Sequence, residues 1–406
     1  MRSPGGIEAW LIEDHALPIL SVNFGFRGGA NLDVDERAGT AAMLGSLLTE
    51  GAGSMTATAF QQALGNRAIR MTFGVTPDLT WGDLRCMVRH ADRAFEMLGL
   101  ALREPRLAPE AIERARARMA AALRAAVEKP EYVAGRAFAA EGFAGHPYAR
   151  AIMGESETIQ AITCADLLAL HPRLVSRSNL RIGVVGAIDP DRLGPLLDRA
   201  FADLPSPLVP PVAQVTLRGL GRRVLKRMAL PQSTLVFGRP GLPRHDPDFL
   251  ASVVVNLCLG GGFTSRLFKE VREKRGLCYA INSSLAVTDG SATLRSTTST
   301  RNDRTAEVID VVMGEFRRLV AQGIGEEELA RTKGNLIGSH CLQLSNSGAL
   351  ANALLTIQLD GRDPDWLDRR NSGIASVGIA DARRASERLL GDGSLFVVVC
   401  GDPPED

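Results

Sequence analysis

The sequence predicts an α+β fold of two similar domains, each a mostly antiparallel sheet with helices on one face. The first reason is an internal duplication, in which residues 162–189 align with residues 377–403 at a separation of 215, so that Gly186 falls on Gly401. The second is a matching pair of helix starts, 107–116 and 324–333, at a separation of 217. The third is the proline-rich stretch 205–211 between the two copies.

Each half opens with a strand pair, predicted at 7–13 with 19–27 and at 223–229 with 233–238. Long helices rich in Ala, Leu and Arg then alternate with further strands. Each duplicated segment ends as a helix, a β-branched strand and a glycine turn. Hairpins and helices are mixed without a strict βαβ repeat, which favours α+β layers.

The join between the halves follows a predicted helix at 190–204 and has an extended, proline-rich composition. We therefore predict an N-terminal domain over 1–205, a linker over 206–221 and a C-terminal domain over 222–406.

The composition excludes several classes of function. Lys and Arg number 47 against 46 Asp and Glu, so there is no positive surplus for a nucleic-acid partner. No apolar run is long enough for a membrane span. The six cysteines have neither metal-binding nor redox spacing. The first residues do not resemble a signal peptide, which leaves open a cytoplasmic chain or one whose export signal has been removed, the latter making it periplasmic.

The usual catalytic motifs are absent from the sequence. It has no GxSxG elbow, no P-loop and no GxGxxG after a strand. The six histidines stand singly, and none has a second ligand at helical spacing. We therefore expect this chain to bind no metal and no cofactor of its own.

The most informative stretch is LGGGFTSRLFKEVREKRGLCYAINSSL, residues 259–285. Gly260, Gly261 and Gly262 are predicted to lead into a helix over 264–274, with free N–H groups suited to an anion or a peptide carbonyl. Gly276 is predicted to end that helix, and a strand to begin near Cys278. A simple flexible turn is the other interpretation of the three glycines.

Arg272 and Tyr279 lie seven residues apart across this glycine turn, so both tips can reach one place. A guanidinium beside a phenol suits a carbonyl or a developing oxyanion. The alternative is an ordinary surface arginine and a core tyrosine.

The stretch SRLFKEVREKRGLCYAINSS resembles the second-domain signature of the M16 (pitrilysin-like) zinc peptidases. The segments LIEDHALPILSVNFGFRGGA, REPRLAPEAIERAR, GHPYAR and LRIGVVGAID are similar to the same family. The resemblance covers nearly the whole chain, and it implies two αβ-roll domains of roughly 200 residues. It also implies that Arg272 and Tyr279 reach across to an active site.

Active members of that family carry HxxEH on a first-domain helix, where two histidines bind zinc and the glutamate activates water. The matching segment here, RAGTAAMLGSLLTEG, places Ala42, Gly45 and Ser46 at those positions. The region of the family's third ligand, residues 114–127, contains no acid. Glu50, at helical spacing from Ser46, is interpreted as a helix-end acid.

The lack of these zinc ligands resembles two-chain members of the family, such as mitochondrial processing peptidase, in which one subunit lacks HxxEH. It implies a zinc-free, non-catalytic subunit whose HxxEH-bearing partner holds the zinc. Together the two chains would enclose peptide substrates, with Arg272 and Tyr279 delivered to the partner's site and Gly260 to Gly262 touching peptide backbone. The alternatives are a stand-alone peptide-binding or scaffold protein, as a homodimer, and an enzyme with unrelated chemistry.

Overall fold

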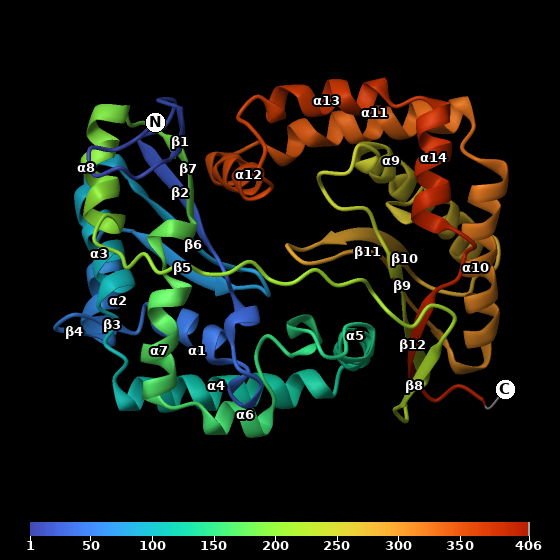
Figure 1. Cartoon of the computed structure of the whole chain (residues 1–406), viewed down its shortest axis with the longest axis horizontal. Helices are drawn as coiled ribbons and strands as arrows, with labels where there is room; N and C mark the ends of the chain where they lie inside the picture. Colours follow the sequence, from blue (N-terminus) through green and yellow to red (C-terminus); the bar gives the residue numbers. More distant parts are fainter. Residues whose placement is uncertain (405–406) are drawn as a thin grey trace. The chain divides into compact units, whose positions relative to one another are not determined.

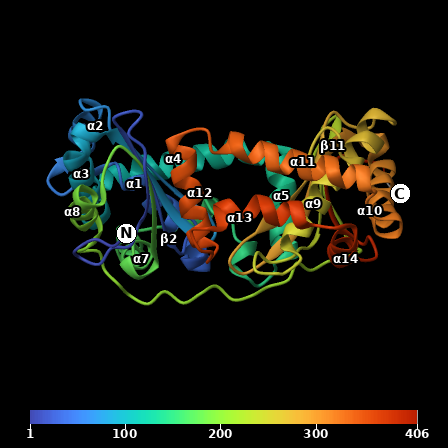
Figure 2. The same ribbon diagram turned by 90° about the horizontal axis from the view of Figure 1, so that it is seen from above.

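A computed structural model describes residues 1–404 and divides them into two compact units. The first unit contains residues 1–123, 150–212 and 341–366, and the second contains 124–149, 213–340 and the described residues from 367. Each unit is built on one five-stranded sheet (Figures 1 and 2). No helix among residues 1–404 is long and apolar enough to cross a membrane.

The first sheet has the order β1-β7-β2-β6-β5. Only the β1–β7 pairing is parallel, and the other three are antiparallel. Its strands are β1 (Trp10–Glu13), β2 (Ile19–Arg27), β5 (Arg70–Val75), β6 (Leu79–Met87) and β7 (Leu180–Gly186).

The second sheet repeats this plan strand for strand. Its order is β8-β12-β9-β11-β10, again with one parallel pairing, between β8 and β12. The strands are β8 (Arg223–Arg227), β9 (Gln232–Pro240), β10 (Ile281–Val287), β11 (Ala292–Arg301) and β12 (Phe396–Gly401). The predicted fold class, two similar and mostly antiparallel α+β layers, is confirmed.

Strand alternation creates one apolar face on each sheet. In β2, Leu20, Val22, Phe24 and Phe26 are buried on the side of α3 (Ala91–Arg103) and α8 (Pro190–Phe201), and the Phe24 and Phe201 ring centroids lie 5.3 Å apart. In the second unit the corresponding core lies among the sheet, α9 (Phe249–Gly260), α10 (Thr305–Gln322) and α14 (Ile379–Leu390).

Two helices at equivalent positions in the two halves of the sequence are exchanged, so that each packs on the sheet built by the other half. They are α5 (Pro130–Gly142) and α12 (Ser347–Leu359), which lie 217 residues apart. Helix α12 packs on β7 and β2 in the first unit, whereas α5 packs on β12 and β9 in the second. Each therefore covers the second face of the sheet that the other half of the sequence supplies.

Both exchanged helices approach their sheets at glycines. A Cβ at Gly183 of β7 would collide with the backbone of Ala351 in α12, and a Cβ at Gly238 of β9 would collide with the Phe138 ring of α5. The Gln358 amide of α12 also donates to the carbonyl of Ile182, at 2.9 Å. Glycine lets a helix lie this close to a strand.

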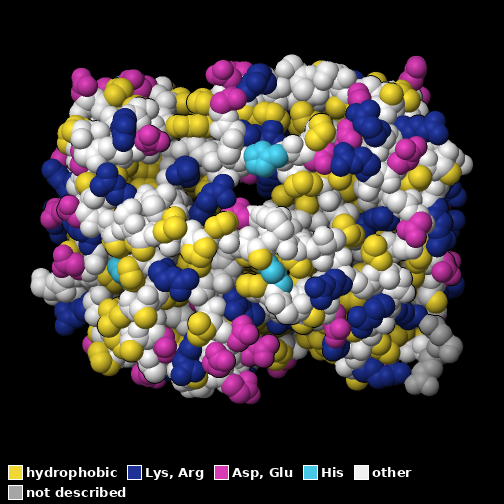
Figure 3. Space-filling model, viewed as in Figure 1, with side chains coloured by type: hydrophobic (Ala, Val, Ile, Leu, Met, Phe, Trp, Pro, Cys, Tyr) yellow, Lys and Arg dark blue, Asp and Glu magenta, His cyan; other side chains and the backbone are white. Residues whose placement is uncertain are grey.

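The remaining helices connect and flank these layers: α1 (Thr40–Leu47), α2 (Ala57–Gly65), α4 (Pro109–Val127), α6 (Ser156–Ala161), α7 (Cys164–Leu174), α11 (Glu326–Gln343) and α13 (Trp366–Ser376). Strands β3 (Gly51–Ala52) and β4 (Met55–Thr56) form a small hairpin. Positive and negative side chains are interspersed on the face that Figure 3 shows.

Gly183→Val tests the close approach of α12 to its sheet. We expect the free energy of unfolding to fall by about 1–3 kcal/mol, because the added side chain forces α12 away from β7. Urea unfolding gives this energy, and hydrogen exchange at β7 and α12 locates the loss. Gly334→Ala in α11 is the matched control, since a Cβ there meets no atom within 4 Å; equal behaviour of the two variants would contradict the packing argument.

Candidate functional site

The three positions that match the zinc motif lie on helix α1. Ala42 is half-buried, Gly45 is buried and Ser46 is exposed. The Ser46 hydroxyl donates back to the carbonyl of Met43, at 2.7 Å. None of these side chains offers an imidazole or a carboxylate, so this helix face cannot form the HxxEH site.

Helix α1 begins on a buried carboxylate. Asp33 is 6% exposed, and its two oxygens accept the N–H groups of Gly39 and Ala41 at 2.8 and 2.9 Å. These bonds satisfy donors that a helix start leaves without partners. Burial raises the pKa of Asp33 to about 6, although both hydrogen bonds and the charge of Arg150 act to lower it.

The Glu50 carboxylate forms ion pairs with two arginines of α4. Arg114 and Arg118 approach its carboxylate at 3.2 and 3.1 Å. Two guanidinium groups thus stand beside it, near the region where the family's third metal ligand would be sought. In the part of the chain that the structure describes, no three His, Cys, Asp or Glu side chains converge as a metal site.

Arg116 on the same helix was not distinguished from its neighbours by sequence reasoning. Its guanidinium donates to the carbonyls of Ile159, Gln160 and Ile162, and only 12% of its side chain is exposed. It therefore anchors the end of α6 and the turn that leads into α7.

The glycine run lies in the second unit, and it ends one helix instead of starting the next. Gly260 is the last residue of α9, and the Gly261 N–H donates to the carbonyl of Leu257 at 3.2 Å. The following helix begins only at residue 266. The prediction of free N–H groups was wrong for Gly261, whose N–H caps α9. Gly260 is part of α9 itself, and Gly262 precedes the next helix.

The three glycines differ in the space around them. A Cβ at Gly260 would lie 2.6 Å from the Ser283 hydroxyl, and one at Gly261 would lie 2.5 Å from Leu257. A Cβ at Gly262 meets nothing within 4 Å. Gly260 and Gly261 are therefore required by packing, whereas Gly262 is exposed and open.

Arg272 and Tyr279 are brought together by a helix end and a glycine. Arg272 lies in the π-helical segment Phe268–Glu273. Gly276, with φ of +61°, donates its N–H to the Arg272 carbonyl at 3.0 Å and reverses the chain. Tyr279 then returns beside Arg272, as predicted from their spacing, and the strand follows at Ile281.

The Arg272 guanidinium lies between two aromatic rings. Its central carbon is 4.6 Å from the Phe268 ring centroid and 5.1 Å from that of Tyr279. Phe263 adds an edge-to-face contact with Phe268, at 5.2 Å. We call these four side chains the aromatic ladder: Phe263, Phe268, Arg272 and Tyr279. Sequence reasoning missed both phenylalanines, although their spacing in FTSRLFKEVR was visible.

The two outer members of the aromatic ladder are open to solvent. Tyr279 is 85% exposed and Phe263 is 77% exposed, whereas Phe268 is buried. Tyr279 is therefore not a core residue. Among residues 1–404 the structure shows no carboxylate paired with Arg272, and the two rings hold its guanidinium by cation–π contact.

Comparison with known proteins finds relatives that resemble M16 peptidases. Residues 161–336 match the family described as "Peptidase M16 inactive domain". The chain is 29% identical over 261 residues to an uncharacterized zinc protease of Streptomyces coelicolor, an alignment that covers 63% of this chain and 57% of that protein. It is 27% identical over 338 residues to a non-peptidase homolog of Helicobacter pylori, covering 82% and 77%. The chain is therefore similar to M16 peptidase-like proteins over most of its length, with the match to the family itself lying in residues 161–336.

The fold of this chain matches a solved structure over its full length. The crystal structure of a peptidase M16 inactive domain from Pseudomonas fluorescens has a TM-score of 0.93 at 22% identity, covering 100% of this chain and 97% of that one. At this identity the match shows a shared fold. The Streptomyces alignment spans just over half of that relative's length.

The buried carboxylate at the start of α1 predicts a pH effect in this chain. Because the pKa of Asp33 is raised from 3.8 to about 6, the folded chain keeps a proton at pH 5 that the unfolded chain has released. The stabilisation is present at low pH and is lost as pH rises through about 6. Between pH 4 and 7 the free energy of unfolding should fall by up to about 3 kcal/mol from this group.

Asp33→Asn should remove this fall, as measured by urea unfolding across that pH range. Asp203→Asn, at an exposed carboxylate just after α8, is the control and should leave the slope unchanged. An unchanged slope in Asp33→Asn would contradict the assignment.

Proposed function

We propose that this chain is the non-catalytic subunit of a two-chain zinc metalloendopeptidase. An HxxEH-bearing M16 partner holds the zinc, and the two chains together enclose the peptide. This chain supplies Arg272 and Tyr279 to the partner's active site. The observation that carries the proposal is the Arg272 guanidinium, held between two rings and without a carboxylate partner in the described chain.

The chemistry of this arrangement suits a carbonyl that becomes an oxyanion. A guanidinium paired with a carboxylate has committed its donors, whereas one held by ring faces keeps its N–H groups for an acceptor. The exposed Tyr279 hydroxyl is a second donor on the same side of the turn. Donors placed in advance at a developing oxyanion stabilise the transition state.

Helix α1 also supports the assignment of this chain as the non-catalytic subunit. Ala42, Gly45 and Ser46 offer no ligand for zinc and no base to activate water. Hydrolysis therefore requires a metal site on another chain. In this proposal Gly262, the open member of Gly260 to Gly262, contacts the peptide backbone while the other two shape the loop.

A peptide-binding or scaffold protein without hydrolytic activity is the second candidate. The similarity to the non-peptidase homolog of Helicobacter pylori favours it. The exposed aromatic ladder suits peptide capture as well as catalysis. The two candidates differ in whether turnover depends on Arg272.

Substitutions in the assembled pair test the role of the two donors. Arg272→Ala should lower kcat of peptide cleavage by about a hundredfold or more. Tyr279→Phe should lower it by about tenfold, the loss of one neutral hydrogen bond. Arg383→Ala is the matched control, because this arginine is exposed and pairs with Glu387 on α14, outside the aromatic ladder. Assembly is checked by gel filtration, and full activity in Arg272→Ala would exclude the proposed role.

Zinc and partner are tested together by capturing the tagged chain from its source cells. We expect a second M16 chain bearing HxxEH, with about one zinc per pair and that zinc lost when the partner's motif is mutated. Recovery of this chain alone and without zinc would favour the scaffold. Zinc on the isolated chain would contradict the ligand argument for α1.

A further inference from the structure

The helical segment that carries Arg272 has a different hydrogen-bond register from an α-helix. Residues 268–273 form a π-helix, in which an N–H group donates to the carbonyl five residues earlier instead of four. The Lys274 N–H follows this register and donates to the carbonyl of Lys269, at 2.9 Å. Because π-helical turns are rare and frequent at functional sites, the contacts that hold this one bear on the aromatic ladder.

Arg275 binds both acceptor groups of Glu270. Its guanidinium donates to the Glu270 carboxylate at 2.6 Å and to the Glu270 carbonyl at 2.9 Å. In an α-helix that carbonyl would accept the N–H of Lys274, which here donates to Lys269 instead. The Arg275 side chain therefore satisfies a carbonyl that the π-helical register separates from its α-helical donor.

Glu270 is a buried charge that needs this partner. It is 7% exposed, and its carboxylate also pairs with Lys274 at 2.5 Å. Hydrogen bonds from Lys274 and Arg275 hold the pKa of Glu270 below its ordinary value. Arg318 of α10 lies 3.7 Å from the same carboxylate. Since a buried carboxylate is costly without partners, the register that brings Arg275 to Glu270 is favoured.

The start of the segment is fixed by a separate ion pair. Arg266 donates to the Glu328 carboxylate of α11 at 2.6 Å and to the Gly323 carbonyl at 2.7 Å. A change of register at Glu270 therefore has to be taken up at the other end of the segment, toward Gly276.

The extra residue of the π-helical turn persists as far as Gly276. The Gly276 N–H donates to the carbonyl of Arg272, and the Leu277 N–H donates to that of Val271. Each of these bonds spans one residue more than in the usual glycine-ended helix cap. A return to the α-helical register would remove this residue and rotate Arg272 by about 100° relative to the turn.

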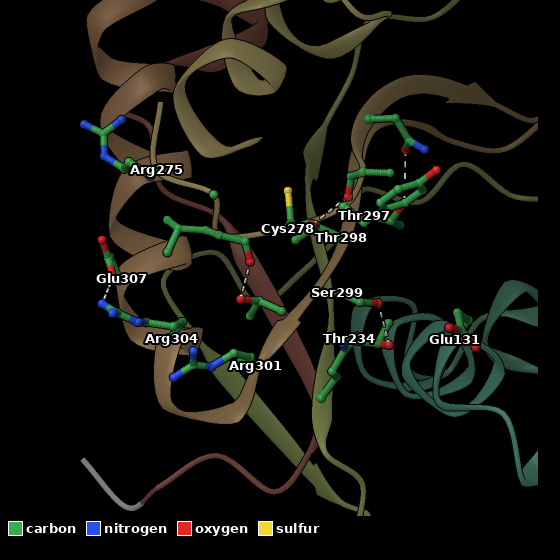
Figure 4. A pocket seen from close by; sticks show the side chains of 17 residues that line it. Glu131, Thr234, Arg275, Cys278, Thr297, Thr298, Ser299, Arg301, Arg304 and Glu307 are labelled. Carbon is green, nitrogen blue, oxygen red and sulfur yellow. Dashed lines mark hydrogen bonds and ion pairs between the residues drawn. The ribbon is translucent and has the colours of Figure 1, made fainter. Parts of the chain in front are cut away.

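The loop that carries Tyr279 is held by different contacts. Two buried threonine hydroxyls of β11 donate to carbonyls of this loop, at 2.8 and 2.6 Å. Figure 4 shows the cavity beside the loop, with the Arg275 side chain turned away from Cys278. Loss of the Arg275 pair would therefore move Arg272 and leave Tyr279 in place.

We propose that Glu270, through its pair with Arg275, is the positioning residue for Arg272. The pair fixes the π-helical register, and the register places the Arg272 guanidinium between the rings of Phe268 and Tyr279. The inference rests on the proposed function in one respect, that Arg272 acts on a carbonyl in the partner's site.

The register is tested by hydrogen exchange on the full-length chain alone. Glu270→Gln should speed exchange at the amides of residues 271–277 by about tenfold or more, because the turn opens more often without the pair. Arg275→Gln removes the same pair at a more exposed position and should act alike, so poor folding of Glu270→Gln does not prevent the test. Asp310→Asn, at an exposed carboxylate of α10, is the matched control and should leave these amides unchanged.

The positioning role is tested in the assembled pair by a double-mutant cycle. Arg275→Gln should lower kcat by about tenfold or more with KM nearly unchanged, because a displaced donor stabilises the transition state less. The same substitution should have no further effect in Arg272→Ala, since a positioning residue acts only through the group that it holds. A residue that only stabilises the fold would lower activity equally in both backgrounds.

Unchanged hydrogen exchange in both variants would overturn the inference, and so would an unchanged kcat in Arg275→Gln. An equal loss of kcat with and without Arg272 would also overturn it. Full activity of Arg272→Ala would instead overturn the proposed function, and hydrogen exchange would then decide the register by itself.

Discussion

The close contact between two glycine-bearing strands and two exchanged helices is the constraint on which the rest of this structure depends. Gly183 admits α12 to the first sheet, and Gly238 admits α5 to the second. Without these helices each sheet would keep only the cover that its own half supplies, and a strand buried on one face would be exposed on the other. Each unit is therefore complete only with a helix from the other half of the sequence.

The candidate site depends on this contact through β9. Gly238 lies on β9, and Phe138 of α5 packs against it. Strand β9 pairs with β11 along its whole length, so the exchanged helix supports two neighbouring strands of this sheet. The aromatic ladder is fixed more locally, by the turn at Gly276 and by the buried ring of Phe268. The sheet and the aromatic ladder are thus held in place by different contacts.

The sequence predicted most of the fold because the duplication left two copies of one pattern. Two strands that end in Gly186 and Gly401, and helices at equal separations, predicted that the elements repeat in both units. The predicted pairing of 7–13 with 19–27 and of 223–229 with 233–238 was wrong, because β7 and β12 lie between these strands. The meeting of Arg272 and Tyr279 also followed from local spacing, since a glycine turn brings residues seven apart together. The domain boundaries at 205 and 222 and the roles of the site residues stay predictions.

Other features were not accessible from the sequence, for physical reasons. Helices α5 and α12 have the same kind of apolar face, so their pattern does not say which sheet each one covers. Arg116 looks like its neighbours until the carbonyls that it binds are located in space. The length over which β10 pairs with β11 depends on the register between the two strands, and a single sequence does not specify where a partner strand begins.

The reciprocal position of α5 and α12 also bears on how such a chain arose. If the two halves descend from one shorter polypeptide, that ancestor had a sheet face that its own helix does not cover in the present arrangement. Two copies lending each other this helix would have formed a domain-swapped homodimer with two-fold symmetry. Joining two such copies in one chain would carry the same exchange of helices into a single polypeptide. Substitutions at Ala42, Gly45 and Ser46 would leave that exchange intact, because none of these residues lies on α5 or α12.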